Sequence, residues 1–215
     1  MRPLASDYPL SKVVQGDKER EVIIGALPGS AGTLMLQWLG ALGFAPVSTH
    51  GHIGMRGDFR ISMHRDPRDS ICSLARRKFY NEYTEDRENG LLLACDDFIA
   101  NRWVDDAVRN QLTAHLVIRF EDYFYDFTDE LLDDLLYKLD LVVPDWFFGY
   151  LLWEFSLERN RLRASRLKDF GEVDWLTRIH GRHITSGQIG VWGELFTPRV
   201  TEKVKELEIE RLGYE

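Results

Sequence analysis

The sequence predicts an α/β fold: a central parallel β-sheet of about four to five strands, flanked by helices in a three-layer sandwich, with a mostly helical C-terminal part. Two observations carry this prediction. Short apolar segments alternate with longer amphipathic segments over the first two-thirds of the chain, and helical patterns dominate the rest. Short apolar strands between helices are typical of a parallel sheet that is covered on both faces. A chain of 215 residues fits one such domain.

The expected strands are short apolar segments bounded by turn residues, and they lie at 22–27, 46–49, 60–64 and 115–120. The expected helices have apolar residues at helical spacing, and they lie at 33–42, 67–80, 91–111 and 127–139. Pro144 suits the first turn of a further helix that carries the aromatic run Trp146–Phe155, for which core packing or a subunit interface is favoured. Residues 169–190 lack periodicity and predict a loop, before a charged helix at 198–212. The single domain thus divides into an N-terminal extension (1–20), an α/β core (22–126) and a helical part (127–215).

The composition excludes several classes of protein. A net charge of −8 argues against sequence-independent nucleic-acid binding, which requires a basic face. Cys72 and Cys95 form no disulfide framework and lack metal-ligand spacing, so reduced thiols and no metal are expected. No apolar run is long enough for a membrane span, and the N-terminus lacks the apolar region of a signal peptide. These observations predict a soluble, cytoplasmic protein.

A glycine-rich turn follows the first expected strand in "VIIGALPGSAGTLM", residues 22–35. A strand, a glycine-rich turn and a helix N-terminus bind phosphate through backbone N–H groups and the helix dipole. The loop has no lysine or arginine, and its spacing departs from the nucleotide-binding loop that ends in Gly-Lys-Ser/Thr. A tight turn without a ligand is therefore an open alternative for this segment alone.

A second motif, "FRISMHRDPRDSICSLARR" (residues 59–77), places Arg65 where a strand ends and Ser73 in the following helix. A guanidinium and a hydroxyl presented at this edge of a sheet suit a phosphate monoester. The alternative is that Arg65 pairs with Asp66 or Asp69 and holds the turn. For the neighbouring basic run at 76–78, a solvated helix face is weighed equally with a basic pocket.

Four segments, in order, resemble the sulfotransferases that use 3′-phosphoadenosine 5′-phosphosulfate (PAPS). "LPGSAGTLM" is similar to the family's 5′-phosphosulfate loop, and "HRDPRDSICSL" to its 3′-phosphate motif. "LVIRFEDYFYD" (116–126) is similar to its Arg-Tyr-Glu-Asp-Leu strand and turn. "SGQIGVWGELFT" (186–197) is similar to its C-terminal segment, which folds over the nucleotide. The resemblance spans residues 22 to 197 and implies a P-loop-like fold and a PAPS-dependent sulfotransferase.

The resemblance implies a set of residues that hold the nucleotide. The 5′-phosphosulfate is expected to bind the backbone and hydroxyl groups of Gly29, Ser30, Ala31, Gly32, Thr33 and Leu34. The resemblance assigns the 3′-phosphate to Arg65 and Ser73. Ser186, Gly187 and Gly190 of the covering loop (180–197) are expected to contact the same phosphate. Arg182 is expected to substitute for the basic residue that the family usually has in this loop. Phe120, Ser156 and Trp192 are expected near the nucleotide, whereas Glu121 and Asp122 are expected to order the turn after the fourth strand.

The segment "STHGHIG" offers a general base, since imidazole has a suitable pKa for accepting a proton near neutral pH. The family's catalytic histidine often follows a strand in the context Lys-Thr-His, which makes His50 the first choice and His52 the second. A polar turn without a catalytic role is the alternative. No metal is expected to take part. The predicted acceptor is a small molecule with a hydroxyl or an amine, and a homodimer is compatible with the sequence.

Gly29 departs from the family, which has a lysine or arginine at this position. Arg56 and Arg182 are the candidate replacements. Two other functions therefore stay open: a non-catalytic module that binds PAPS or another nucleotide, and a small P-loop kinase that acts on a metabolite.

Overall fold

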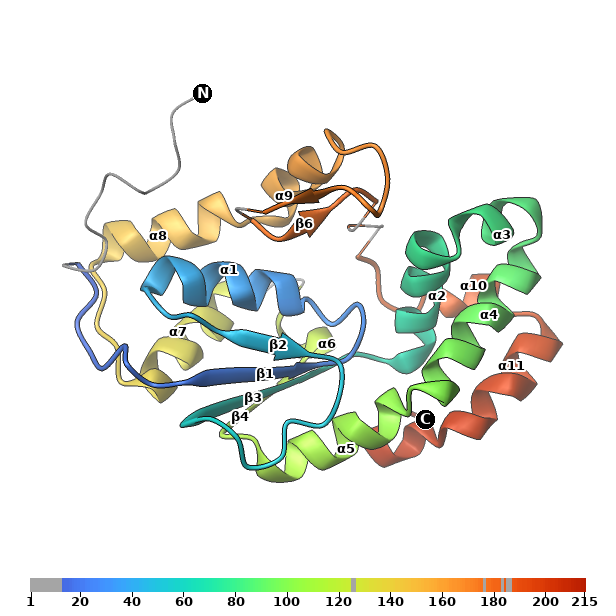
Figure 1. Cartoon of the computed structure of the whole chain (residues 1–215), viewed down its shortest axis with the longest axis horizontal. Helices are drawn as coiled ribbons and strands as arrows, with labels where there is room; N and C mark the ends of the chain where they lie inside the picture. The colour runs from blue at the N-terminus through green and yellow to red at the C-terminus, as the bar shows by residue number, and fades with distance from the viewer. Residues whose placement is uncertain (1–12, 125–126, 176, 183, 185–186) are drawn as a thin grey trace.

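A computed structural model describes residues 13–124, 127–175, 177–182, 184 and 187–215 (Figure 1). Its centre is a parallel four-stranded sheet in the order β2-β1-β3-β4. The strands are β1 (Val22–Ala26), β2 (Val47–Thr49), β3 (Phe59–His64) and β4 (Leu116–Arg119). This confirms the predicted α/β fold and four predicted strands, whose ends differ from the sequence prediction by one residue.

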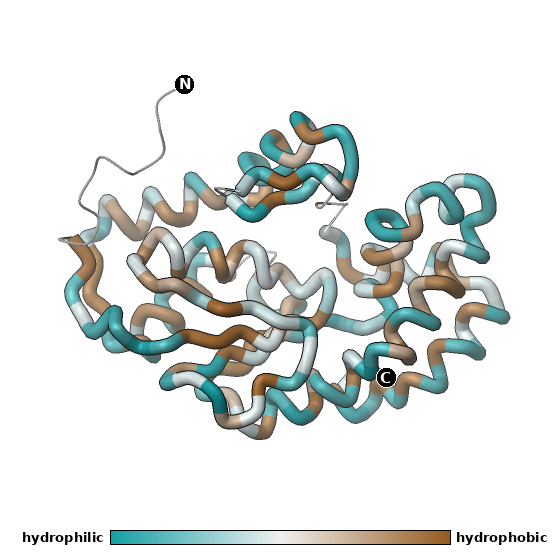
Figure 2. The backbone as a smooth tube through the Cα atoms, viewed as in Figure 1, coloured by the Kyte–Doolittle hydropathy of each residue, from teal (hydrophilic) through white to brown (hydrophobic). Residues whose placement is uncertain are grey.

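Helices α1 (Gly32–Leu42), α7 (Thr128–Leu139) and α8 (Asp145–Glu154) share one hydrophobic core with the sheet. Alternate strand residues, such as Val22, Ile24 and Ala26 of β1, point into this core, as the period of two in a strand requires. Figure 2 shows the hydrophobic residues gathered along the strands and the inner sides of these helices. The sheet is thus fixed rigidly on this face.

A second core lies among α2 (Pro67–Lys78), α4 (Arg87–Ala100), α5 (Trp103–Thr113) and α11 (Pro198–Val204). In Figure 1 these helices gather beside the sheet together with α3 (Tyr80–Glu85) and α10 (Trp192–Leu195). The C-terminal 3-10 turns, Lys205–Leu207 and Ile209–Leu212, complete the group. Among the helices described, none combines the length and apolar character needed to cross a membrane.

Several predicted element bounds were wrong. The predicted helix 91–111 is two helices, α4 and α5, because Arg102 adopts a left-handed backbone (φ 54°) that ends the first. Both helices pack into one core, so their apolar pattern continues across the break. The predicted helix 67–80 ends at Lys78, and the helix at 198–212 continues from Val204 as 3-10 turns.

The predicted loop 169–190 contains a short hairpin, β5 (Val173–Asp174) and β6 (Ile179–His180). It follows α9 (Leu157–Ala164), and both lie above α1 in Figure 1. Phe120, predicted to end the fourth strand, begins the short helix α6 (Phe120–Tyr123).

Strand register brings the candidate motifs to one edge. Gly25 of β1 pairs with Thr49 of β2 and with Ser62 of β3. The segments that follow β1, β2 and β3 therefore leave the same, C-terminal edge of the sheet, where open α/β sheets bind ligands.

Candidate functional site

A cavity of about 530 Å³ opens at this edge, a volume typical of small-molecule sites. Its walls come from the glycine-rich loop, α1, α2, α6, the region from α8 to α9, and the hairpin. The predicted residues among its lining are Gly29, Ala31, Thr33, Leu34, Arg65, Ser73, Phe120, Ser156 and Gly187. The structure thus brings together residues from all four sequence segments that lie up to 158 positions apart, from Gly29 to Gly187.

The glycine-rich loop is held by its own hydrogen bonds. The Ser30 backbone N–H and hydroxyl both donate to the Leu27 carbonyl oxygen, at 3.1 and 2.6 Å. Gly29 and Ala31 have left-handed backbones, with φ of 80° and 65°. This conformation turns the chain directly into α1, whose first turn leaves N–H groups without acceptors in the helix. Ser30 therefore orders the loop, and the start of α1 presents donors to the cavity.

The loop packs against α2. A Cβ atom at Gly29 would lie 3.5 Å from both Cβ and Oγ of Ser73 and 3.8 Å from Cα of Ser70. A side chain here has space, but its positive φ disfavours any residue other than glycine. The lack of a side chain at this position therefore agrees with the backbone conformation.

Arg65 lies at the C-terminal end of β3 and is 4% exposed. Its Nη2 donates to the Gln188 carbonyl oxygen at 2.5 Å and lies 3.7 Å from Asp69 Oδ2. Its guanidinium carbon lies 4.3 Å from the centroid of the Phe120 ring. Its Nε is buried without a hydrogen-bond partner. A buried donor left unpaired is costly, so a cavity-lining guanidinium of this kind fits an anionic ligand.

Asp69 ties the C-terminal segment to α2. Its Oδ2 accepts from the Gly190 N–H at 2.7 Å, and its Oδ1 accepts from the Trp192 N–H at 3.3 Å. Burial raises the pKa of Asp69, and the Gly190 N–H and the Arg65 charge oppose this rise. The Arg68 guanidinium carbon lies 4.0 Å from the centroid of the Trp192 ring. Trp192 and Gly190 thus fasten the covering segment and do not line the cavity themselves.

One wall of the cavity is apolar. The rings of Phe120 and Phe124 stack with centroids 4.7 Å apart, and Leu34 and Phe155 line the same space. Trp38, which sequence reasoning did not select, also lines it, and its Nε1 is buried without a hydrogen-bond partner. Flat apolar walls suit a heteroaromatic ring.

Ser156 caps α9, where its Oγ accepts from the Arg159 N–H at 3.4 Å. It also lines the cavity. Its side chain thus has a local structural role beside any contact with a ligand.

His50 follows β2 and is bound to the end of β1. Its Nδ1 lies 2.5 Å from the Ala26 carbonyl oxygen, which only accepts, so Nδ1 carries the proton and Nε2 of the neutral ring is basic. The residue retains solvent access at one side, while its ring is crowded against the Trp103 ring, with centroids 5.8 Å apart. Desolvation lowers the pKa of His50, the Ala26 carbonyl opposes this, and the charge of Arg77 lowers it further. The ring is therefore neutral at pH 7.

His52 lies in the same turn but is bound on the other side. Its Nδ1 donates to Asn110 Oδ1 at 3.0 Å, and the same oxygen accepts from the Ile53 N–H at 2.9 Å. Asn110 Nδ2 donates to the Gly51 carbonyl oxygen at 3.1 Å. Asn110 thus orders the turn that carries both histidines. Neither histidine lines the cavity; both lie at the sheet edge beside the glycine-rich loop.

Arg77 is the main site residue that sequence reasoning underestimated, because it was weighed equally as part of a solvated helix face. It is 7% exposed and lines the cavity. Its Nε donates to the Ser73 carbonyl oxygen at 3.3 Å, and its guanidinium carbon lies 5.8 Å from the centroid of the Phe170 ring. The ion pairs found among the described residues do not include it. Burial, with a smaller effect of the Arg65 charge, lowers the pKa of Arg77 to about 10, so it stays charged at pH 7.

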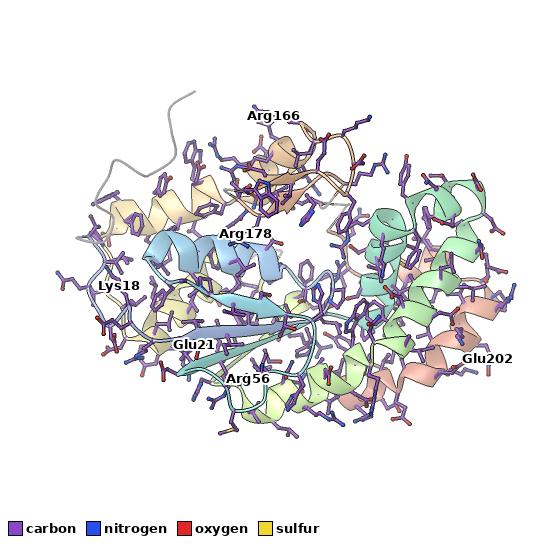
Figure 3. The ribbon with its side chains drawn as sticks, in the orientation of Figure 1. Lys18, Glu21, Arg56, Arg166, Arg178 and Glu202 are labelled. Carbon is purple, nitrogen blue, oxygen red and sulfur yellow. The ribbon has the colours of Figure 1, made fainter. Side chains whose placement is uncertain are left out.

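The two arginines that the sequence offered as replacement cations lie elsewhere. Arg56 is exposed on the loop before β3, and Figure 3 shows it beneath the sheet. The hairpin that precedes Arg182 lies on the other side, above α1, where Figure 3 labels Arg178. Arg182 is exposed, and its guanidinium carbon lies 3.8 Å from the centroid of the Tyr80 ring. Neither lines the cavity. The predicted residue Ser186 lies outside the described residues.

A buried network behind the site was also missed. Glu121 accepts from the Asp66 N–H at 2.8 Å and from the Tyr214 hydroxyl at 2.9 Å. The same hydroxyl lies 3.2 Å from His64 Nδ1. Glu121 therefore joins the turns after β3 and β4, as expected for it, and the C-terminal tyrosine completes the link. No sequence pattern marks a tyrosine 150 residues away as a partner of His64.

Comparison with known proteins supports the fold. The crystal structure of mouse sulfotransferase SULT7A1 complexed with PAP superimposes with a TM-score of 0.64, covering 97% of this chain and 90% of the mouse chain, at 15% sequence identity. No protein-family model matches the sequence, and no curated protein matches it. A likeness at this identity shows the fold alone. The chain therefore has a sulfotransferase-like α/β fold.

Proposed function

We propose that this protein transfers a sulfuryl group from PAPS to a hydroxyl or amine of a small-molecule acceptor. One observation carries the proposal: Arg65 is buried at the sheet edge with an unpartnered Nε and lines a cavity that also contains the glycine-rich loop. A nucleotide with a phosphate at its 3′ position requires a cation in addition to the phosphate loop. The mouse protein with the same fold was solved with PAP, the desulfated nucleotide, which supports this assignment.

The residues present fit such a nucleotide. Arg65 and Ser73 are proposed to hold the 3′-phosphate, and Thr33 with the first turn of α1 to hold the 5′ group. The apolar wall, with Phe120 and Phe124, suits the adenine. When bound, PAPS supplies the activated sulfuryl group.

His50 is proposed as the general base. Its Nδ1 is bound to the Ala26 carbonyl oxygen, so its Nε2 takes the acceptor's proton. The acceptor oxygen or nitrogen forms the new bond to sulfur, and the electron pair of the breaking S–O bond stays on the 5′-phosphate. Negative charge therefore grows beside the glycine-rich loop, where a cation lowers the barrier.

Titration calorimetry tests the nucleotide assignment. The protein should bind PAP without a metal ion and more tightly than ATP, and Arg65→Ala should weaken PAP binding at least tenfold, the effect of losing one charge-assisted hydrogen bond. Arg76→Ala, a change of the same kind on a half-buried arginine of α2, should leave PAP binding unchanged. Tight ATP binding that depends on Mg²⁺ would instead support the kinase.

A PAPS-dependent screen of hydroxyl and amine acceptors, read by mass shift, tests the transfer, with Arg65→Ala as the control. The missing cation at Gly29 keeps the non-catalytic nucleotide-binding module as the second candidate. PAP binding with no sulfated product across the screen would favour that module.

A further inference from the structure

Arg77 is a buried cation whose anion is not supplied by the ion pairs of the described residues. A buried charge costs several kcal/mol unless it is paired, so such a residue destabilises the protein unless a ligand uses it. The cavity that Arg77 lines is the one assigned above to the nucleotide. The question is which anion it meets there.

The geometry ties Arg77 to the glycine-rich loop. Its Nε is bound to the carbonyl oxygen of Ser73, one helical turn earlier, and Ser73 Oγ lies 3.5 Å from where a Cβ of Gly29 would be. Gly29, Ser73 and Arg77 all line the same cavity, so Arg77 borders the space that Gly29 also borders. Gly29 is the position at which the resembling family carries a lysine or arginine.

The charge also reaches the proposed base, because the field of Arg77 contributes to the lowered pKa of His50. A cation that lines the cavity with Gly29 and whose field reaches His50 is suited to stabilise charge that develops between these two groups. Arg65 is placed differently, beside Gln188 and Asp69 of the covering segment's attachment. The two guanidiniums are close enough for the Arg65 charge to lower the pKa of Arg77, but only Arg65 is bound to the covering segment.

We propose that Arg77 is a catalytic residue that replaces the missing cation at Gly29: it binds the 5′-phosphosulfate and stabilises the charge that develops on the leaving 5′-phosphate. This inference rests on the proposed function. The catalytic cation would then come from α2 and not from the glycine-rich loop. Arg77 lies one helical turn after Ser73, the serine of the 3′-phosphate motif.

The test compares PAP with adenosine 3′-phosphate, which lacks the 5′ group, by titration calorimetry. Arg77→Met, which keeps an unbranched apolar stem and removes the charge, should weaken PAP binding at least tenfold and leave binding of adenosine 3′-phosphate unchanged. Arg65→Ala should weaken both ligands, and Arg77→Lys should retain part of the PAP affinity. Arg76→Ala is the matched control. Where an acceptor is found, kcat should fall further than PAP affinity.

A stability measurement separates this role from a structural one. Since no carboxylate among the described residues forms an ion pair with Arg77, Arg77→Met should unfold at the same or a higher temperature than the parent protein. Unchanged PAP binding in Arg77→Met would overturn the inference; if sulfation of an anionic acceptor alone were lost, Arg77 would bind the acceptor instead. Failure of the parent protein to bind PAP would overturn the proposed function itself, which distinguishes the two failures.

Discussion

His64 makes the stability of this protein depend on pH in a way that can be calculated. The ring is 4% exposed, and burial, followed by the charge of Arg119, lowers its pKa from 6.5 to about 4, while Asp122 opposes this. As the pH falls, His64 therefore becomes protonated near pH 6.5 in the unfolded chain but only near pH 4 in the folded protein. Stability from this group is complete above pH 6.5 and is lost as the pH falls through this window.

The size of the effect follows from the two pKa values. Each pKa unit corresponds to about 1.4 kcal/mol, so His64 contributes about 3 kcal/mol in total. Between pH 7 and pH 4.5 about 2 kcal/mol of unfolding free energy should be lost through this residue. His50 and His115, whose pKa values are also lowered, act in the same direction, whereas the raised pKa of Asp69 opposes them near pH 4.

A variant isolates the contribution of His64 from the rest. Urea unfolding of the parent protein and of His64→Gln at pH 7, 5.5 and 4.5 should give curves whose difference in free energy shrinks or reverses by about 2 kcal/mol toward low pH. The variant is less stable at pH 7 if the Tyr214 contact is lost, but only the slope with pH matters. Equal slopes for both proteins would refute the assigned pKa and its cause.

Four further outcomes are expected. Ala31→Gly relieves the strain of a non-glycine residue at positive φ. The free energy of unfolding should rise by up to about 1 kcal/mol in urea titrations, and the affinity for PAP should stay the same. A lower stability of the variant would contradict the assigned strain. Asp69→Asn removes the charge that accepts from two N–H groups of the covering segment. PAP should therefore dissociate at least about tenfold faster in stopped-flow measurements. An unchanged dissociation rate would exclude a role of Asp69 in holding the covering segment over the nucleotide. His50→Ala should abolish turnover and leave PAP binding nearly intact, while near-normal turnover would move the base to His52. In the parent protein kcat/KM should stay level down to a pH below 6.5, because the pKa of His50 is lowered.

Local sequence patterns were enough to predict most of the fold. Four strands, their parallel arrangement and the clustering of motifs at one edge could be predicted, because each is a property of short segments and of strand direction. Element ends could not, because the break at Arg102 depends on a backbone angle that no apolar pattern encodes. The hairpin of β5 and β6 was invisible for a related reason: its strands have two residues each.

The candidate site divides in the same way. Arg65 and Ser73 were predictable because the motif fixes their spacing, and both line the cavity. Arg77 was ambiguous, since three successive basic residues leave open which one faces inward until the helix is packed. The link from His64 to Tyr214 is a tertiary contact between segments that the sequence does not connect.

The left-handed backbone of Gly29 limits where a positive charge can be introduced. A lysine at this position would meet an unfavourable φ, so a single substitution would add the charge only together with backbone strain. Ala31 holds the same left-handed conformation two residues later, so the turn carries this constraint at two positions. Positive charge can reach the cavity without this strain from the neighbouring helix α2, where Arg77 lines the same space as Gly29.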